Sequence, residues 1–99
     1  MYFKIHKSKD GKILAVADED QIGKHLKHGD IDFFVNPRFY GEEKAAKEWL
    51  IPQMRSNEVL AVNLIGKEAV ATGIAAGVIE KGKVHKIGKI PHAQSFLIF

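Results

Sequence analysis

The stretch YFKIHKSKDGKILAVA, residues 2–17, predicts an N-terminal β-hairpin. Its first residues alternate apolar and polar side chains, which is the period of a strand with one buried face. The Asp-Gly pair at residues 10–11 favours the positive φ angles of a tight hairpin turn. The apolar run at residues 13–17 then predicts a second strand that is buried more deeply.

Further strands and helices alternate along the rest of the chain. Strand character is found at residues 31–35, 84–90 and 95–99, the last two flanking Pro91 and His92, whereas residues 59–62 fit either a strand or the entry to a helix. Helical spacing is found at residues 18–29, 42–51 and 66–76. The 99 residues fit one domain, residues 1–99. We therefore expect a single α+β domain whose mixed sheet is packed by two or three helices.

A proline affects where the first of the two clearest helices ends, and small residues affect how the second one packs. Pro52 lacks a backbone N–H, so the helix at residues 42–51 either ends near Ile51 or kinks and resumes through Met54. The later helix carries a stripe of mostly small side chains at positions 66, 69, 70, 73, 74 and 77. Such a stripe either packs closely on the sheet or pairs with the same helix of a second copy.

The composition excludes several classes of protein. The chain has no cysteine, which rules out disulfides, thiolate catalysis and Cys-ligated metals. Because small secreted domains generally need disulfides, we expect a cytoplasmic protein. No stretch approaches the roughly 20 apolar residues that span a bilayer, and we expect no membrane partner. Nucleotide-binding glycine motifs are absent too, so no cofactor is expected.

Positive charge is concentrated at the two ends of the chain, which carries a net charge of +3. The candidate phosphate contacts are Lys4, Lys7, Lys83, Lys86 and Lys89. If both ends enter the sheet side by side, they form a basic surface suited to RNA. The alternative is that these lysines only solubilise the protein, since arginine, the more specific reader of phosphates and bases, is rare here.

Two further patterns concern metals and anions. His25 and His28 would share one face of a helix, as in a two-histidine metal site, but no third ligand accompanies them. We therefore expect exposed polar side chains and no metal. Gly66 opens a predicted helix, and the backbone amides of residues 66–68 are candidates to bind an anion.

His92 and Asn63 are the candidate catalytic residues. An imidazole titrates near neutral pH, so His92 suits a general base, a phosphate contact or a structural hydrogen bond. Asn63 interrupts an apolar stretch and either caps the following helix or faces a cleft with His92. Because no serine or acid completes a triad, the structural role of His92 is the simplest. Tyr40, beside Arg38 and Phe39, either stacks on an RNA base or anchors its loop to the core.

Four motifs, in this order, resemble the archaeal domain-of-unknown-function family 424. They are a Phe-x-Ile hairpin, Phe-Tyr-Gly-Glu at residues 39–42, Asn-Leu-Ile-Gly at residues 63–66 followed by Glu-Ala-Val at residues 68–70, and Ile-Pro-His-Ala-Gln at residues 90–94. The resemblance covers nearly the whole chain and implies an archaeal cytosolic protein. It implies no activity, because the family is uncharacterised. It singles out Asn63, Gly66, Pro91, His92 and Gln94.

Three functions follow as expectations. The first is a small basic protein that binds RNA, free or on the ribosome, with Tyr40, Gly66 and Gln94 near the lysines as further binding residues. The second is a small enzyme in which His92 is the acid or base and Asn63 orients the substrate. The third is a homodimeric interaction module that uses the small-residue helix or the apolar stretch at residues 96–99.

Overall fold

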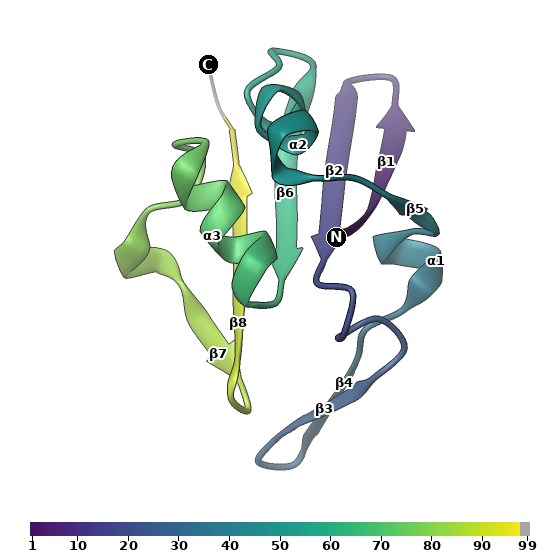
Figure 1. Ribbon diagram of the computed structural model, residues 1–99, viewed down its shortest axis with the longest axis vertical. Coiled ribbons are helices and arrows are strands. Elements are labelled where there is room, and N and C mark those ends of the chain that lie inside the picture. Colours follow the sequence, from purple (N-terminus) through teal and green to yellow (C-terminus); the bar gives the residue numbers. More distant parts are fainter. Residues whose placement is uncertain (98–99) are drawn as a thin grey trace.

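The computed structural model describes residues 1–97 and contains one six-stranded mixed sheet and one two-stranded sheet (Figure 1). The strands are β1 (Tyr2–Ser8), β2 (Gly11–Ala17), β3 (His25–His28), β4 (Ile31–Phe34), β5 (Glu43–Lys44), β6 (Val59–Ile65), β7 (His85–Ile87) and β8 (Ile90–Phe96). The helices are α1 (Pro37–Tyr40), α2 (Lys47–Met54) and α3 (Lys67–Ala75), with a 3-10 turn, η1, at Lys81–Lys83. The expected α+β class is thus confirmed.

The predicted N-terminal hairpin forms the start of the large sheet, whose order is β5-β1-β2-β6-β8-β7. β1 and β2 pair antiparallel, with Tyr2 opposite Ala17 and Ser8 opposite Gly11. β6 joins β2 in parallel and β8 in antiparallel orientation. Residues 59–62 therefore belong to a strand, the first of the two alternatives.

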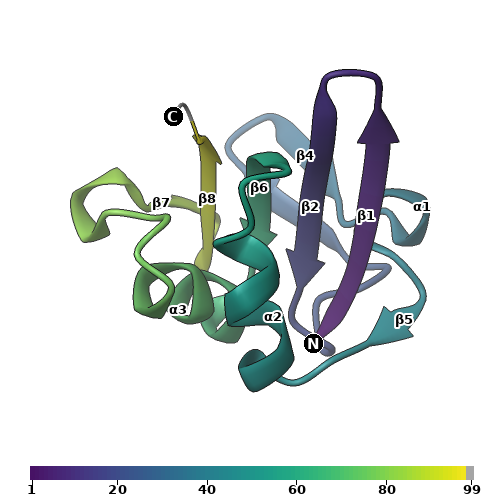
Figure 2. The same cartoon turned by 90° about the horizontal axis from the view of Figure 1, so that it is seen from above.

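Both faces of the large sheet are covered, by different elements. Figure 2 shows α2 and α3 on one side and the β3–β4 hairpin on the other. Alternation along β2 produces this arrangement, because Leu14 and Val16 pack with α2 and α3 while Ala15 and Ala17 face α1 and the hairpin. No helix within residues 1–97 is long and apolar enough to cross a membrane.

The predicted helix at residues 18–29 is wrong, because the chain forms turns and then β3 there. Gly23 and Gly29 adopt φ angles of 79° and 60°, which end any helix and turn the chain into and out of the strand. Leu26 is buried between the exposed residues His25 and Lys27, as the alternation of side chains in a strand requires. The two histidines therefore do not share a helix face.

The helix predicted at residues 42–51 is displaced along the chain. Glu43 and Lys44 pair with the edge of β1 as β5, and α2 begins only at Lys47. The helix then continues through Pro52 to Met54, the second of the alternatives that its sequence left open. Its start was misplaced because two acids look like a helical first turn whether or not they pair with a strand edge.

The C-terminal strands also differ from the prediction. The turn lies at Gly88, whose φ angle is 65°, and Pro91 and His92 lie within β8 instead of between two strands. Of the predicted last strand, residues 98 and 99 lie outside the described residues. The small-residue stripe of α3 packs inside the molecule, since a Cβ on Gly73 would lie 2.4 Å from Leu64 Cδ1.

Candidate nucleic-acid interface

The two lysine-rich ends do not become neighbours, contrary to our expectation. β1 carries Lys4 and Lys7, and β8 is separated from it by β2 and β6. The parallel pairing of β6 with β2 places β6 between the two ends of the chain. Positive charge at the two ends therefore occupies different parts of the surface.

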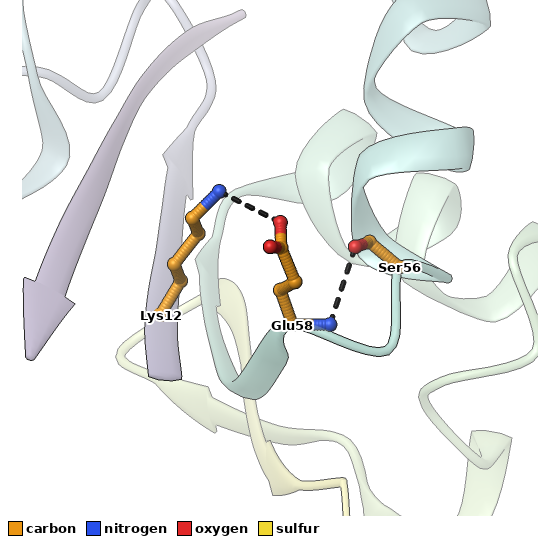
Figure 3. A network of polar contacts seen from close by, with 3 residues as sticks. All are labelled: Lys12, Ser56 and Glu58. Carbon is orange, nitrogen blue, oxygen red and sulfur yellow. Dashed lines mark hydrogen bonds and ion pairs between the residues drawn. The ribbon is translucent and has the colours of Figure 1, made fainter. Parts of the chain in front are cut away.

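Some lysines near the N-terminus are paired with a carboxylate or a backbone oxygen. Lys4 Nζ donates to Arg38 O at 2.9 Å. Lys12 Nζ lies 2.9 Å from Glu58 Oε2, and Ser56 Oγ accepts from the Glu58 N–H (Figure 3). The hydrogen bond and charge of Lys12 lower the pKa of Glu58 below its usual value. This end of the sheet thus offers less free positive charge than its lysine content suggests.

A second lysine cluster forms where β3 meets the turn between β7 and β8. The Gly88 N–H donates to His28 Nδ1 at 3.1 Å. Only glycine fits at residue 88, because a Cβ there would lie 2.7 Å from Lys27 O and the φ angle is positive. This contact brings together two segments that are 60 positions apart in the sequence.

We call this cluster the β3–β7 surface. It is composed of exposed side chains, namely Lys27, His28, His85, Lys86 and Lys89. Lys27 pairs with Asp32, whereas Lys83, Lys86 and Lys89 take part in no ion pair within residues 1–97. Two of the five predicted lysines, Lys86 and Lys89, therefore lie next to partners from β3 that the sequence did not suggest, whereas Lys83 lies in η1 and lines a hollow beside the end of β8.

An exposed aromatic side chain lies on the same hairpin. Phe34 is 43% exposed, and its ring stacks on His25 with a centroid distance of 4.6 Å. Asp32 Oδ1 lies 3.1 Å from Nδ1 of the same histidine. The exposure of Phe34 could not be predicted from the sequence, because an apolar residue in a strand usually faces the core.

Asn63 and His92 do come together, in a buried chain of hydrogen bonds that also includes Tyr40. Tyr40 Oη donates to Asn63 Oδ1 at 2.7 Å, and His92 Nε2 lies 3.3 Å from the same oxygen. His92 Nδ1 lies 2.8 Å from His85 Nε2. Because Asn63 Oδ1 can only accept, the network assigns a proton to His92 Nε2, and His92 Nδ1 accepts from His85.

Burial keeps the inner members of this chain uncharged. His92 is 5% exposed, and burial together with the neighbouring His85 lowers its pKa to about 4. Tyr40 is 2% exposed, and burial raises its pKa well above the usual value. Both groups are therefore neutral at neutral pH, and the chain ties α1, β6, β8 and β7 to one another.

Two predicted binding or capping roles are corrected by this geometry. Tyr40 is buried, so it anchors its loop and cannot stack on a base. Asn63 lies within β6 and does not cap α3, whose N-cap is Gly66. A partner for Asn63 could have been anticipated, because a polar side chain in an apolar strand needs one, but its identity as Tyr40 could not.

The anion expected at Gly66 is a carboxylate of the protein itself. Asp18 Oδ2 and Oδ1 accept from the N–H groups of Glu68 and Ala69 at 3.0 and 2.7 Å. Gly66 makes room for it, since a Cβ there would lie 2.3 Å from Asp18 Cγ. The amides of Glu68 and Ala69 are thus already paired. Gln94 lies exposed on β8 opposite Asn63, away from this helix end.

Comparisons with known proteins agree with the fold. A family model described as "Protein of unknown function (DUF424)" matches residues 6–98. The crystal structure of an uncharacterized conserved protein from Methanopyrus kandleri is similar, with a TM-score of 0.85 and 24% identity over 96% of this chain and 89% of that chain. At this identity the likeness shows a shared fold. No curated protein matches significantly.

Proposed function

Since this chain belongs to the DUF424 family of proteins of unknown function, we propose a function from the chemistry of its own surface: it binds single-stranded RNA through the β3–β7 surface. The observation that carries this proposal is the contact between Gly88 and His28, which joins Lys86 of β7 and Lys89 of the following turn to the β3–β4 hairpin. Without that contact, the lysines and the exposed aromatic would belong to separate parts of the molecule.

The electrostatics favour a phosphate backbone as the ligand. Lys86 and Lys89 carry no ion-pair partner within the described chain, so they are free to replace the counterions of phosphates. The exposed imidazoles of His28 and His85 add further hydrogen-bonding groups beside the lysines. Phosphate contacts of this kind orient a nucleic acid but do not read its sequence.

The exposed ring of Phe34 favours a single strand over a duplex. Unpaired bases stack on exposed aromatic side chains, and every base offers a face for this contact. The surface has lysines and no arginine, which suits point-charge contacts with phosphates better than bidentate recognition of bases. We therefore expect RNA binding with little sequence preference, to free RNA or to an exposed single strand of the ribosome.

A fluorescence anisotropy titration with a labelled oligouridylate tests the proposal. At low salt the protein should bind, and the logarithm of the association constant should fall with that of the salt concentration by about 0.7 per phosphate contacted. A variant with Lys86→Glu and Lys89→Glu should bind at least about tenfold more weakly. The control variant with Lys47→Glu and Lys67→Glu makes the same change of net charge on the helix side and should retain binding.

Two results would contradict RNA binding at this surface. One is the absence of binding at low salt. The other is an equal loss of affinity in the test and control variants, which would mean that only the overall net charge of the protein matters.

The enzyme alternative has weaker support. Asn63 and His92 lie in contact, as that hypothesis required, but both ring nitrogens of His92 have protein partners and the ring is buried. A general base needs a nitrogen within reach of a substrate proton. The geometry therefore favours a positioning role in which His92 holds His85 at the β3–β7 surface.

A further inference from the structure

β8 has an open edge along its second half. β7 pairs only with residues 90–92 of this strand, whereas β6 pairs with its other side as far as Phe96. Antiparallel strands direct the N–H and C=O groups of each residue to one side, and successive residues alternate sides. Residues 93–96 therefore have backbone groups on the side that β7 does not reach.

The hydrogen bonds to β6 identify which residues face the open side. The Leu97 N–H donates to Leu60 O at 2.7 Å, and Pro91 O accepts from the Gly66 N–H at 2.8 Å. Odd-numbered residues of this stretch thus point toward β6. By alternation, the N–H and C=O groups of Gln94 and Phe96 point to the open edge, where no backbone partner is found within residues 1–97.

The open edge lacks the features that keep strand edges of monomeric proteins apart. Exposed edges are usually protected by charged side chains, proline or a bulge. The edge of β1 carries Lys4 and Lys7, but β8 has no charged residue, and its single proline lies where β7 already pairs. Phe96 on this edge is 77% exposed, more than any other large apolar side chain of the described chain.

A groove runs beside the open edge. One hollow of about 440 Å³ lies between Gln94, Ser95 and Phe96 and the segment from Gly77 to Glu80. A second hollow of about 570 Å³ continues it past Phe96 to Leu97 and shares Gly77 and Val78 with the first. The protein's own chain therefore leaves space along the edge of β8.

We propose that the occupant is a second copy of this chain, with β8 of each copy pairing antiparallel about a two-fold axis at Ser95. Gln94 of each copy then lies opposite Phe96 of the other copy, which makes two equivalent residue pairs. Both residues direct their backbone groups outward, so each pair exchanges two hydrogen bonds. The exposed edge is self-complementary, which is what a two-fold interface requires.

The length of the open edge favours this register. β7 closes the edge at His92, and β8 ends at Phe96, so the free stretch is centred close to Ser95. Pairing about Ser95 uses the residues on both sides of it and avoids β7 of either copy. The groove does not favour an acidic partner strand, because it is lined by both Glu80 and Lys83, whose opposite charges offset each other.

Apolar side chains support the pairing on the face opposite α2 and α3. Ile13 lies beside Ala61, which lies beside Phe96, and these three residues form one row across the sheet. In the dimer the two Phe96 rings are diagonal neighbours across the new strand pair, a separation that aromatic side chains bridge. The dimer thus covers the most exposed of the large apolar side chains of the described chain.

Sedimentation equilibrium of the full chain over a wide concentration range is the first test. We expect a mass twice that of the chain, with Phe96→Glu reducing it to the mass of one chain at the same concentration. Gln94→Pro should do the same, because it removes an outward donor and leaves the bonds to β6 in place. Phe34→Glu, at another exposed phenylalanine, is the matched control and should leave the dimer intact. Circular dichroism checks that each variant is folded.

A cysteine crosslink then tests the register. Residues at the centre of such a pairing form a non-hydrogen-bonded pair with Cα atoms about 4.5 Å apart, which is within the range of a disulfide. The chain has no cysteine of its own, so Ser95→Cys introduces a single thiol. Mild oxidation should convert this variant into a covalent dimer, and adding Phe96→Glu should suppress the crosslink.

Several outcomes would overturn the proposal. A monomeric wild-type protein at all concentrations would do so, as would a dimer that survives both Phe96→Glu and Gln94→Pro. Equal crosslinking of Ser8→Cys, at the exposed β1–β2 turn, would mean that the Ser95→Cys crosslink comes from collisions. None of these tests involves RNA, so their failure and the failure of the proposed function are distinguishable.

Discussion

Asn63 is the residue on which the buried polar chain depends. Its Oδ1 accepts from Tyr40 Oη and from His92 Nε2, and both donors are buried. An asparagine inside a central strand is costly unless its polar atoms are paired, and the pairing in turn places α1 and β8 against β6. The residue thus links strand packing to the position of the β3–β7 surface.

Asn63→Ala should destabilise the fold by about 1–3 kcal/mol for each buried donor that it leaves without a partner. The measurement is the free energy of unfolding from urea titration. Asn57→Ala, at an exposed turn, is the control and should change stability by less than about 0.5 kcal/mol. If Asn63→Ala and Tyr40→Phe have additive effects, the two side chains are not coupled and the predicted network is wrong.

The pKa of His92 makes stability depend on pH in a definite direction. Its folded pKa of about 4 lies below the ordinary value of 6.5, so between these pH values the unfolded chain binds a proton that the folded protein does not. The contribution of neutral His92 to the free energy of unfolding is therefore complete above pH 6.5. It is lost as the pH falls toward 4, at up to about 1.4 kcal/mol per pH unit.

His92→Gln should remove this pH dependence. Urea titrations of both proteins at several pH values give the difference in unfolding free energy, which should shrink as the pH falls from 6.5 to about 4. A constant difference over that range would show that His92 titrates alike in the folded and unfolded states.

At the scale of elements, Gly88 decides whether the β3–β4 hairpin and β7 form one surface. Gly88→Ala introduces a Cβ 2.7 Å from Lys27 O and should separate the two elements. Gly77→Ala is a matched control, because its φ angle of 78° is equally unfavourable for alanine but no atom lies within 4 Å. Both variants should lose stability, and only Gly88→Ala should also weaken oligouridylate binding in the anisotropy assay. If Gly88→Ala binds RNA as tightly as the wild-type protein, the β3–β4 hairpin does not contribute to RNA binding.

At the scale of the whole molecule, the two proposed interactions should respond to salt in opposite ways. RNA binding releases counterions and weakens as salt rises. The residues that pair in the β8 interface are uncharged, whereas each copy has a net charge of +3, so added salt screens the repulsion between copies and should leave the dimer unchanged or more stable. Anisotropy and sedimentation, measured across the same salt series, compare the two trends. A dimer that dissociates with rising salt would point to an interface held by charge instead of by β8.

The local pattern of the chain was enough to predict its hairpin, its class and the helix α3. These depend on the alternation of residues 2–17, on the Asp-Gly turn and on helical spacing after Gly66, and neighbours in the sequence decide such features. The family resemblance was also carried by local motifs, and it singled out Asn63 and His92, which lie in one network.

Tertiary structure alone decided which residues meet. Lysines at the two ends looked alike in the sequence, but the insertion of β6 between β2 and β8 separated them and left those of β7 beside β3. The pattern around His25 and His28 fitted a helix as well as a strand, and only packing of Leu26 on the sheet distinguishes the two. Strand order and long-range contacts depend on the free energy of the whole packed domain, which no short stretch of sequence contains.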